Sequence, residues 1–118
     1  MGMTGTSICC ESRITIGDHV RLGNLVTIVD TDFHPLNLHH RLVAPNDGRS
    51  KPITIEDHVF IGMSVMVLKG SHIGRGSVIG AGSVVTGTIP PNVIAAGNPA
   101  VVIKQLDNTV PTNHVSNK

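Results

Sequence analysis

Aliphatic residues recur at every sixth position along most of this 118-residue chain. The row that they form consists of Ile16, Leu22, Ile28, Ile55, Ile61, Val67, Ile73, Ile79 and Val85. A period of six matches neither an α-helix, which repeats every 3.6 residues, nor a strand that alternates every second residue. It indicates short strands joined by corners, so that three hexapeptides close one triangular coil. The chain is therefore predicted to form an all-β parallel β-helix, in which each coil pairs with the next about 4.8 Å away.

The repeat also predicts how the coil is filled. The first row should point inward and stack on the residues one coil later. The stacked pairs include Ile55 with Ile73, Ile61 with Ile79 and Val67 with Val85. A second row, four residues after the first, is expected to fit the corners and consists of Val20, Val26, Asp32, Val59, Val65, Ser71, Ser77, Ser83 and Ile89. Glycines that directly follow the first row, such as Gly62 and Gly74, should supply corner dihedrals. A narrow interior also explains the lack of Trp and Tyr.

One long insertion interrupts the repeat. Residues 14–20 (ITIGDHV) recur as residues 53–59 (ITIEDHV), an offset of 39 that equals one coil of 18 residues plus 21. We therefore predict a loop extruded from the coil at about residues 31–51, and a loop of this length is usually functional or disordered. The β-helix domain is expected to span residues 1–106. A polar, aperiodic tail follows at 107–118, which we expect to be disordered or loosely docked.

The composition argues against several classes of protein. Nine Lys and Arg balance eight Asp and Glu, without the basic run that nucleic-acid binding requires. No apolar stretch reaches the roughly 18 residues of a membrane-spanning helix. The N-terminus lacks the pattern of a signal peptide, so a cytoplasmic protein is expected. Cys9 and Cys10 are adjacent, an arrangement in which a disulfide is strained, so both are predicted to be reduced thiols.

Several motifs are more specific than the repeat. They are IGAGSVVT at residues 79–86, IPPN at 89–92, AAGNPA at 95–100, HVFIG at 58–62 and TDFHP at 31–35. Over about residues 14–106 the chain resembles the hexapeptide-repeat acyltransferases, most closely the galactoside, maltose and nodulation O-acetyltransferases. The combination of an extruded His-Pro loop with the Ala-Gly-Asn-Pro segment carries most of this resemblance.

The resemblance implies a left-handed coil, an exception to the usual right-handed crossover. It also implies a homotrimer with active sites between neighbouring subunits. The implied reaction is direct transfer of an acetyl group from acetyl-CoA to a hydroxyl of a sugar or saccharide acceptor. Family members usually carry an N-terminal segment that helps to shape the acceptor pocket, and this chain is expected to lack it because it starts almost on the coil.

His34 is the candidate general base. A thioester is already activated, so acyl transfer to a hydroxyl needs one positioned base and no covalent enzyme intermediate. His34 opens the extruded loop, Pro35 restricts its backbone, and the family's catalytic histidine aligns with it. Asp30 or Asp32 could accept the second imidazole N–H and fix the tautomer. Asp32 is the predicted catalytic partner, with a turn-forming role as the alternative.

Coenzyme A is expected to lie along a face of the coil. The predicted donor-site residues are Phe60, Met63, Gly80, Ala81, Thr86 and Lys104. By resemblance, small residues such as Ala81 let the pantetheine arm approach the backbone, and Lys104 could contact the nucleotide phosphates. At Gly87 many relatives carry a basic residue, so Lys69 or Arg75 could bind the phosphates instead.

Three other functions stay open. A sugar N-acetyltransferase is the nearest, because it differs only in the acceptor. A zinc enzyme similar to the γ-class carbonic anhydrases could use His34, His39 and His40. The anhydrase ligands lie on the coil, whereas these three histidines share one loop, so no metal is predicted. A non-catalytic β-helix scaffold is the third alternative.

Overall fold

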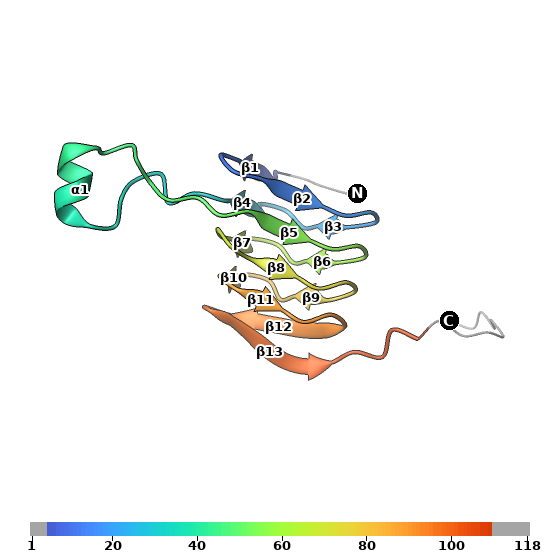
Figure 1. The fold of residues 1–118 in the computed structure, drawn as a ribbon. Helices are drawn as coiled ribbons and strands as arrows, with labels where there is room; N and C mark the ends of the chain where they lie inside the picture. Colours follow the sequence, from blue (N-terminus) through green and yellow to red (C-terminus); the bar gives the residue numbers. More distant parts are fainter. Residues whose placement is uncertain (1–4, 110–118) are drawn as a thin grey trace.

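A computed structural model describes residues 5–109, which form a three-sided coil with one loop projecting from its side (Figure 1). Each side is a sheet of short strands. The first face contains β1 (Ser7–Cys9), β4 (Thr27–Val29), β7 (Met66–Val67) and β10 (Val84–Val85). The second face contains β2 (Ile14–Ile16), β5 (Ile53–Ile55), β8 (His72–Ile73) and β11 (Thr88–Ile89). The third face contains β3 (Arg21–Leu22), β6 (Phe60–Ile61), β9 (Val78–Ile79), β12 (Val93–Gly97) and β13 (Ala100–Gln105).

Strands of successive coils pair in parallel, in the register that the repeat predicts. The paired residues include Ile55 with Ile73, Ile61 with Ile79 and Val67 with Val85. The offset of the insertion is confirmed as well, because β2 pairs with β5 residue by residue, from Ile14 opposite Ile53 to Ile16 opposite Ile55. The fold is the predicted left-handed parallel β-helix.

Two rows of side chains fill the interior. First-row residues from Leu22 to Val85 are buried, and only Ile16 remains half-buried. The second row also points inward except at Asp32, and its valines have no exposed surface. Its serines are buried with their hydroxyls donated to backbone carbonyls, as Ser77 shows with Pro90 at 2.6 Å. Each fully buried aliphatic side chain contributes about 1.5–3 kcal/mol, so stacked rows can stabilise the coil without aromatic rings.

The glycines that follow the first row have a different role from the one predicted. A Cβ at Gly62 would lie 2.8 Å from the Ala81 nitrogen, and one at Gly74 would lie 2.4 Å from the Pro91 nitrogen. These glycines are needed because successive coils approach closely, and their φ angles are not left-handed. The left-handed corner position comes two residues later and is occupied by His19, Leu25, His58, Ser64, Gly70, Gly76 and Gly82.

The outward columns of the three faces differ in polarity. The first face presents Ser7, Thr27, Met66 and Val84. The third face presents Arg21, Phe60, Val78 and Ile94. The second face presents Thr15, Thr54, His72 and Thr88. The third face is therefore mainly apolar on the outside, the first face is half apolar, and the second face is polar.

An antiparallel hairpin of β12 and β13 closes the end of the coil, and the hexapeptide pattern did not predict it. Beyond it, the Asn108 side chain donates to the Asn92 side-chain oxygen at 2.8 Å and to the Gly76 carbonyl at 3.1 Å. The tail expected at 107–118 therefore docks at its start, and residues 110–118 lie outside the described residues. Among residues 5–109 the one helix, α1 (Leu38–Val43), is too short to cross a bilayer.

Candidate active site

The extruded loop leaves the coil after β4 and returns at β5, at the corner between the first and second faces (Figure 1). The outgoing leg (residues 30–37) leads to α1 and the returning leg (residues 44–52) leads back to the coil. The two legs are joined at the root of the loop by backbone hydrogen bonds. The Asp32 N–H donates to the Arg49 carbonyl at 2.9 Å, and the Lys51 N–H donates to the Asp30 carbonyl at 3.0 Å. These bonds fix the direction in which the loop leaves the coil.

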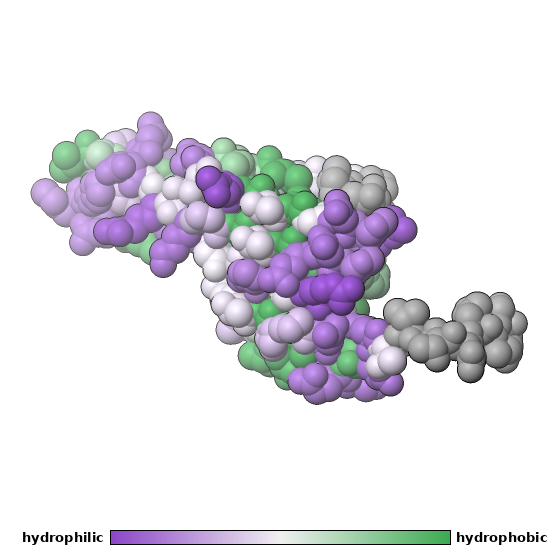
Figure 2. All heavy atoms as spheres, turned by 45° about the vertical axis from the view of Figure 1, so that its right-hand side comes forward, coloured by the Kyte–Doolittle hydropathy of each residue, from purple (hydrophilic) through white to green (hydrophobic). Residues whose placement is uncertain are grey.

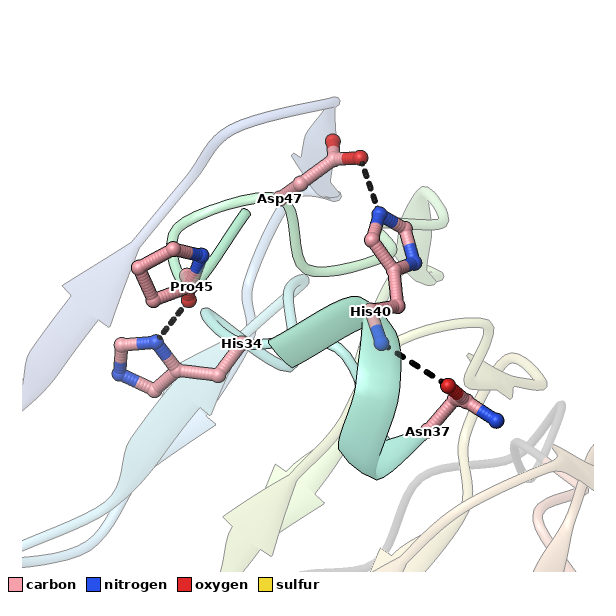
Figure 3. A network of polar contacts seen from close by, with 5 residues as sticks. All are labelled: His34, Asn37, His40, Pro45 and Asp47. Carbon is pink, nitrogen blue, oxygen red and sulfur yellow. Dashed lines mark hydrogen bonds and ion pairs between the residues drawn. The ribbon is translucent and has the colours of Figure 1, made fainter. Parts of the chain in front are cut away.

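The outer part of the loop contains α1, which the sequence did not predict. Asn37 caps the helix, because its side-chain oxygen accepts the N–H of His40 at 2.9 Å. The His40 Nε2 lies 2.8 Å from Asp47 Oδ2, which ties the helix to the returning leg (Figure 3). Hydrophobic residues gather at the outer end of the loop (Figure 2). Those with exposures between 61% and 77% are Leu36, Leu38, Leu42 and Val43.

The His34 ring lies against the returning leg, with Nδ1 2.5 Å from the Pro45 carbonyl oxygen (Figure 3). A carbonyl oxygen can only accept a hydrogen bond, so Nδ1 carries the proton. In the neutral ring, Nε2 therefore holds the free lone pair. Because His34 is exposed, a hydroxyl can reach this nitrogen. Sequence reasoning missed Pro45, since the contact uses a main-chain atom that leaves no signal in the side-chain pattern.

Asp30 serves the coil rather than the His34 ring. It is fully buried, and its carboxylate accepts the N–H groups of Glu11 and Ser12, each at 2.7 Å. Burial tends to raise the pKa of Asp30, but these bonds, together with the Cys10 thiol, outweigh burial and hold the pKa below its ordinary value. The ionised Asp30 thus fastens the first turn of the chain to the root of the loop.

Asp32 supports His34 through the backbone. The His34 N–H donates to the Asp32 carbonyl at 2.7 Å. The Asp32 carboxylate faces Lys69, with Oδ2 3.5 Å from Nζ. The carboxylate expected beside the imidazole is therefore replaced by the carbonyl of Pro45, and Lys69, one of the alternative phosphate ligands, is engaged with Asp32.

Four of the predicted donor-site residues gather at one corner of the coil, between the third and first faces. The Met63 carbonyl accepts the N–H of Gly82 at 2.9 Å, so Met63 and Ala81 sit at the same corner of successive coils. Phe60 lies on the adjoining β6 and is 48% exposed, and Met63 is 52% exposed. Ala81 is exposed and Gly80 half-buried, which leaves the backbone accessible along this corner.

The other two predicted donor residues lie elsewhere on the coil. Thr86 directly follows β10, near the corner from which the loop leaves, and is exposed. Lys104 lies on β13 opposite Ile94, and is exposed at the end of the third face. The structure therefore places neither residue at the corner that contains Met63 and Ala81.

The histidines considered as a zinc site have separate partners. His34 contacts Pro45, and His40 pairs with Asp47. Within residues 5–109, no three His, Cys, Asp or Glu side chains are grouped to hold a metal ion. These contacts stabilise the loop itself.

Known proteins share both the sequence and the coil. Residues 52–87 match the family described as bacterial transferase hexapeptide (six repeats). The chain is 47% identical over 102 residues to the galactoside O-acetyltransferase of Escherichia coli K12, which covers 86% of this chain and 49% of that protein. The chain therefore spans about half the length of this relative.

Two solved structures superpose closely on the coil. A galactoside acetyltransferase in complex with coenzyme A gives a TM-score of 0.83 at 38% identity, over 95% of this chain and 57% of that one. A hexapeptide-repeat-containing acetyltransferase of Vibrio cholerae, complexed with acetyl-CoA, gives a TM-score of 0.81 at 35% identity, over 88% of this chain and 55% of that one. By its repeats, its coil and these relatives, the chain belongs to the hexapeptide-repeat transferase family.

Proposed function

We propose that this chain is an acetyltransferase that moves the acetyl group of acetyl-CoA to a hydroxyl of a sugar or saccharide. The observation that carries the proposal is the bond between His34 Nδ1 and the Pro45 carbonyl, which leaves Nε2 as an accessible base. Relatives named as galactoside acetyltransferases, one of them in complex with coenzyme A, support the choice of donor and acceptor.

The reaction needs one proton to move twice. Nε2 of His34 takes the hydroxyl proton as the acceptor oxygen attacks the thioester carbonyl, and the imidazolium is stabilised by its Nδ1–H bond to Pro45. When the tetrahedral intermediate collapses, the carbon–sulfur bond breaks and the departing thiolate of coenzyme A takes the proton from Nε2. Asp32 belongs to the proposed site, because its carbonyl holds the His34 backbone and Lys69 holds its carboxylate.

Coenzyme A is proposed to run along the corner that contains Met63 and Ala81. The small, exposed Ala81 leaves room for the pantetheine arm, and the exposed side chains of Phe60 and Met63 offer it apolar contacts. Gly80 supports the same corner, because a Cβ there would lie only 3.0 Å from the Cβ of Ala96. Thr86, across the first face from this corner, and Lys104, at the end of the third face, are the remaining residues of the proposed donor site. Lys104 would contribute positive charge toward the phosphates, a contact that salt weakens at an exposed position.

A homotrimer is part of the same proposal. The third face presents Phe60, Val78 and Ile94, and the first face presents Met66 and Val84, so the first face of one subunit can pack on the third face of the next. A head-to-tail contact of this kind closes into a ring when the rotation is threefold. The polar second face would remain in water. Light scattering of the purified chain tests this: a trimer is expected at micromolar concentration, and a stable monomer would contradict it.

The function itself is tested by release of free coenzyme A thiol from acetyl-CoA. The purified chain is incubated with a hydroxyl-bearing galactoside or maltoside, with an amino sugar, or without an acceptor. Thiol release that depends on the hydroxyl sugar, together with a product ester that hydroxylamine cleaves, supports the proposal. Release with the amino sugar alone would identify an N-acetyltransferase. The absence of both acetyl-CoA binding and thiol release would favour the scaffold.

A further inference from the structure

The returning leg of the loop passes directly over the backbone of His34. A Cβ placed on Gly48 would lie 2.4 Å from the carbonyl carbon of Phe33 and 2.5 Å from the backbone nitrogen of His34. Both distances are far inside van der Waals contact, and the atoms concerned are backbone atoms that cannot rotate away. The two legs can cross this closely only because residue 48 has no side chain.

The outgoing leg has little freedom to yield. Phe33 has a φ of 64°, a left-handed conformation that a bulky residue adopts only when its surroundings enforce it. The Phe33 N–H donates to the Thr31 hydroxyl at 3.0 Å, and Thr31 is 95% buried, with 5% of its surface exposed. The tight turn from Thr31 to His34 is therefore fixed on one side by hydrogen bonds and on the other by Gly48.

The returning leg thus holds His34 at two points. Gly48 packs against the His34 backbone nitrogen, and the Pro45 carbonyl accepts a hydrogen bond from the ring Nδ1–H. We propose that Gly48 is a positioning residue for His34: its missing side chain sets the distance between the two legs, and that distance holds the Nδ1–H tautomer. This inference rests on the proposed role of His34 as the base, because positioning affects turnover only if His34 acts.

Gly48→Ala should separate the legs by about 1 Å, the difference between the present contacts and an ordinary contact distance. The bond from His34 Nδ1 to Pro45 would lengthen or break, and a neutral histidine without this bond populates both tautomers. A displacement of about 1 Å lowers turnover by roughly a hundredfold. The KM for acetyl-CoA should stay near wild type, because the proposed donor corner lies on the coil. The melting temperature should also stay near wild type, because Gly48 lies outside the buried core.

The experiment compares wild type, Gly48→Ala and Asn46→Ala by steady-state kinetics, thermal unfolding and nitrogen-15 NMR of the histidine rings. Asn46 is the matched control, an exposed residue on the same leg. We expect kcat to fall about a hundredfold only in Gly48→Ala, and its His34 signal to move from the Nδ1–H form toward a mixture of tautomers.

Wild-type kcat in Gly48→Ala, or an unchanged His34 tautomer, would overturn the inference. A large loss of melting temperature would also overturn it, since the clash would then reach the coil. The NMR readout separates this inference from the proposed function. If the tautomer changes while the wild type shows no acetyl transfer, Gly48 positions His34 but the proposed reaction is wrong.

Discussion

The coil and the extruded loop are built on different physical principles. In the coil, aliphatic side chains stack in buried rows, and one hexapeptide predicts the next. In the loop, the large apolar residues of α1 are exposed, and the fold depends on polar contacts such as His40 with Asp47. The coil can repeat because every turn buries the same kind of aliphatic side chain against the turn before it. The loop carries the candidate base because irregular backbone can present a carbonyl and an imidazole to each other, as it does at Pro45 and His34.

The largest expected effect on stability comes from opening the stacked rows. Ile61 has no exposed surface and lies between Leu22 and Ile79 of the neighbouring coils. Ile61→Ala should lower the free energy of unfolding by about 2–5 kcal/mol, measured by denaturant titration. Thr88→Ala, at an exposed residue on the polar second face, is the control and should change it by less than about 0.5 kcal/mol. Equal losses in both variants would mean that stacking does not support the coil.

A substitution on the outside of the coil should leave stability alone and change donor binding. Ala81→Trp places a large ring on an exposed corner, where the pantetheine arm is proposed to lie. Acetyl-CoA affinity should fall about a hundredfold, equivalent to about 2.7 kcal/mol, while the melting temperature stays near wild type. Calorimetric titration with acetyl-CoA measures this effect, and an unchanged affinity would remove Ala81 from the donor site.

Asp30 connects the coil to the root of the loop, and its contribution to the free energy of unfolding should depend on pH. Its folded-state pKa lies below the unfolded value, so the carboxylate contributes stability at neutral pH, and this contribution disappears as pH falls through the lowered pKa. Asp30→Asn should therefore cost about 1–3 kcal/mol at neutral pH, because the amide oxygen can accept only one of the N–H groups of Glu11 and Ser12 and the amide NH2 would face the other. Urea titrations should show that the difference in free energy of unfolding between wild type and Asp30→Asn becomes smaller under acid conditions. A difference that does not depend on pH would contradict the assignment of Asp30 as an ionised carboxylate.

The period of six was enough to predict the coil, because each inward position has the same requirement for an aliphatic side chain. The offset between the two ITI segments predicted the pairing of Ile14 with Ile53 and the size of the loop. The β12–β13 hairpin escaped prediction because its antiparallel pairing carries no hexapeptide period. The helix α1 escaped because its apolar residues face outward, so it lacks the buried stripe that marks an amphipathic helix.

The candidate site also contains residues that the sequence could suggest and residues that it could not. His34 could be proposed from the sequence, because it opens the extruded loop, precedes Pro35 and aligns with the family's catalytic histidine. The groups that hold it could not, since Pro45 acts through a carbonyl and Gly48 through a missing side chain. The carboxylates of Asp30 and Asp32 looked like partners for His34 by proximity in sequence. The fold directs the first to Glu11 and Ser12, and the second to Lys69.

The central claim is that the coil is the scaffold and that His34 on the loop performs the proton transfer. It is tested most directly by measuring kcat, acetyl-CoA affinity and melting temperature for His34→Ala, with His39→Ala as a control on the same loop. A positioned general base contributes about 10²–10⁴-fold to rate, so kcat of His34→Ala should fall by that factor while affinity and melting temperature stay at wild-type values. His39→Ala should remain close to wild type. If His34→Ala turns over as fast as the wild-type chain, His34 is not the base and the account is wrong.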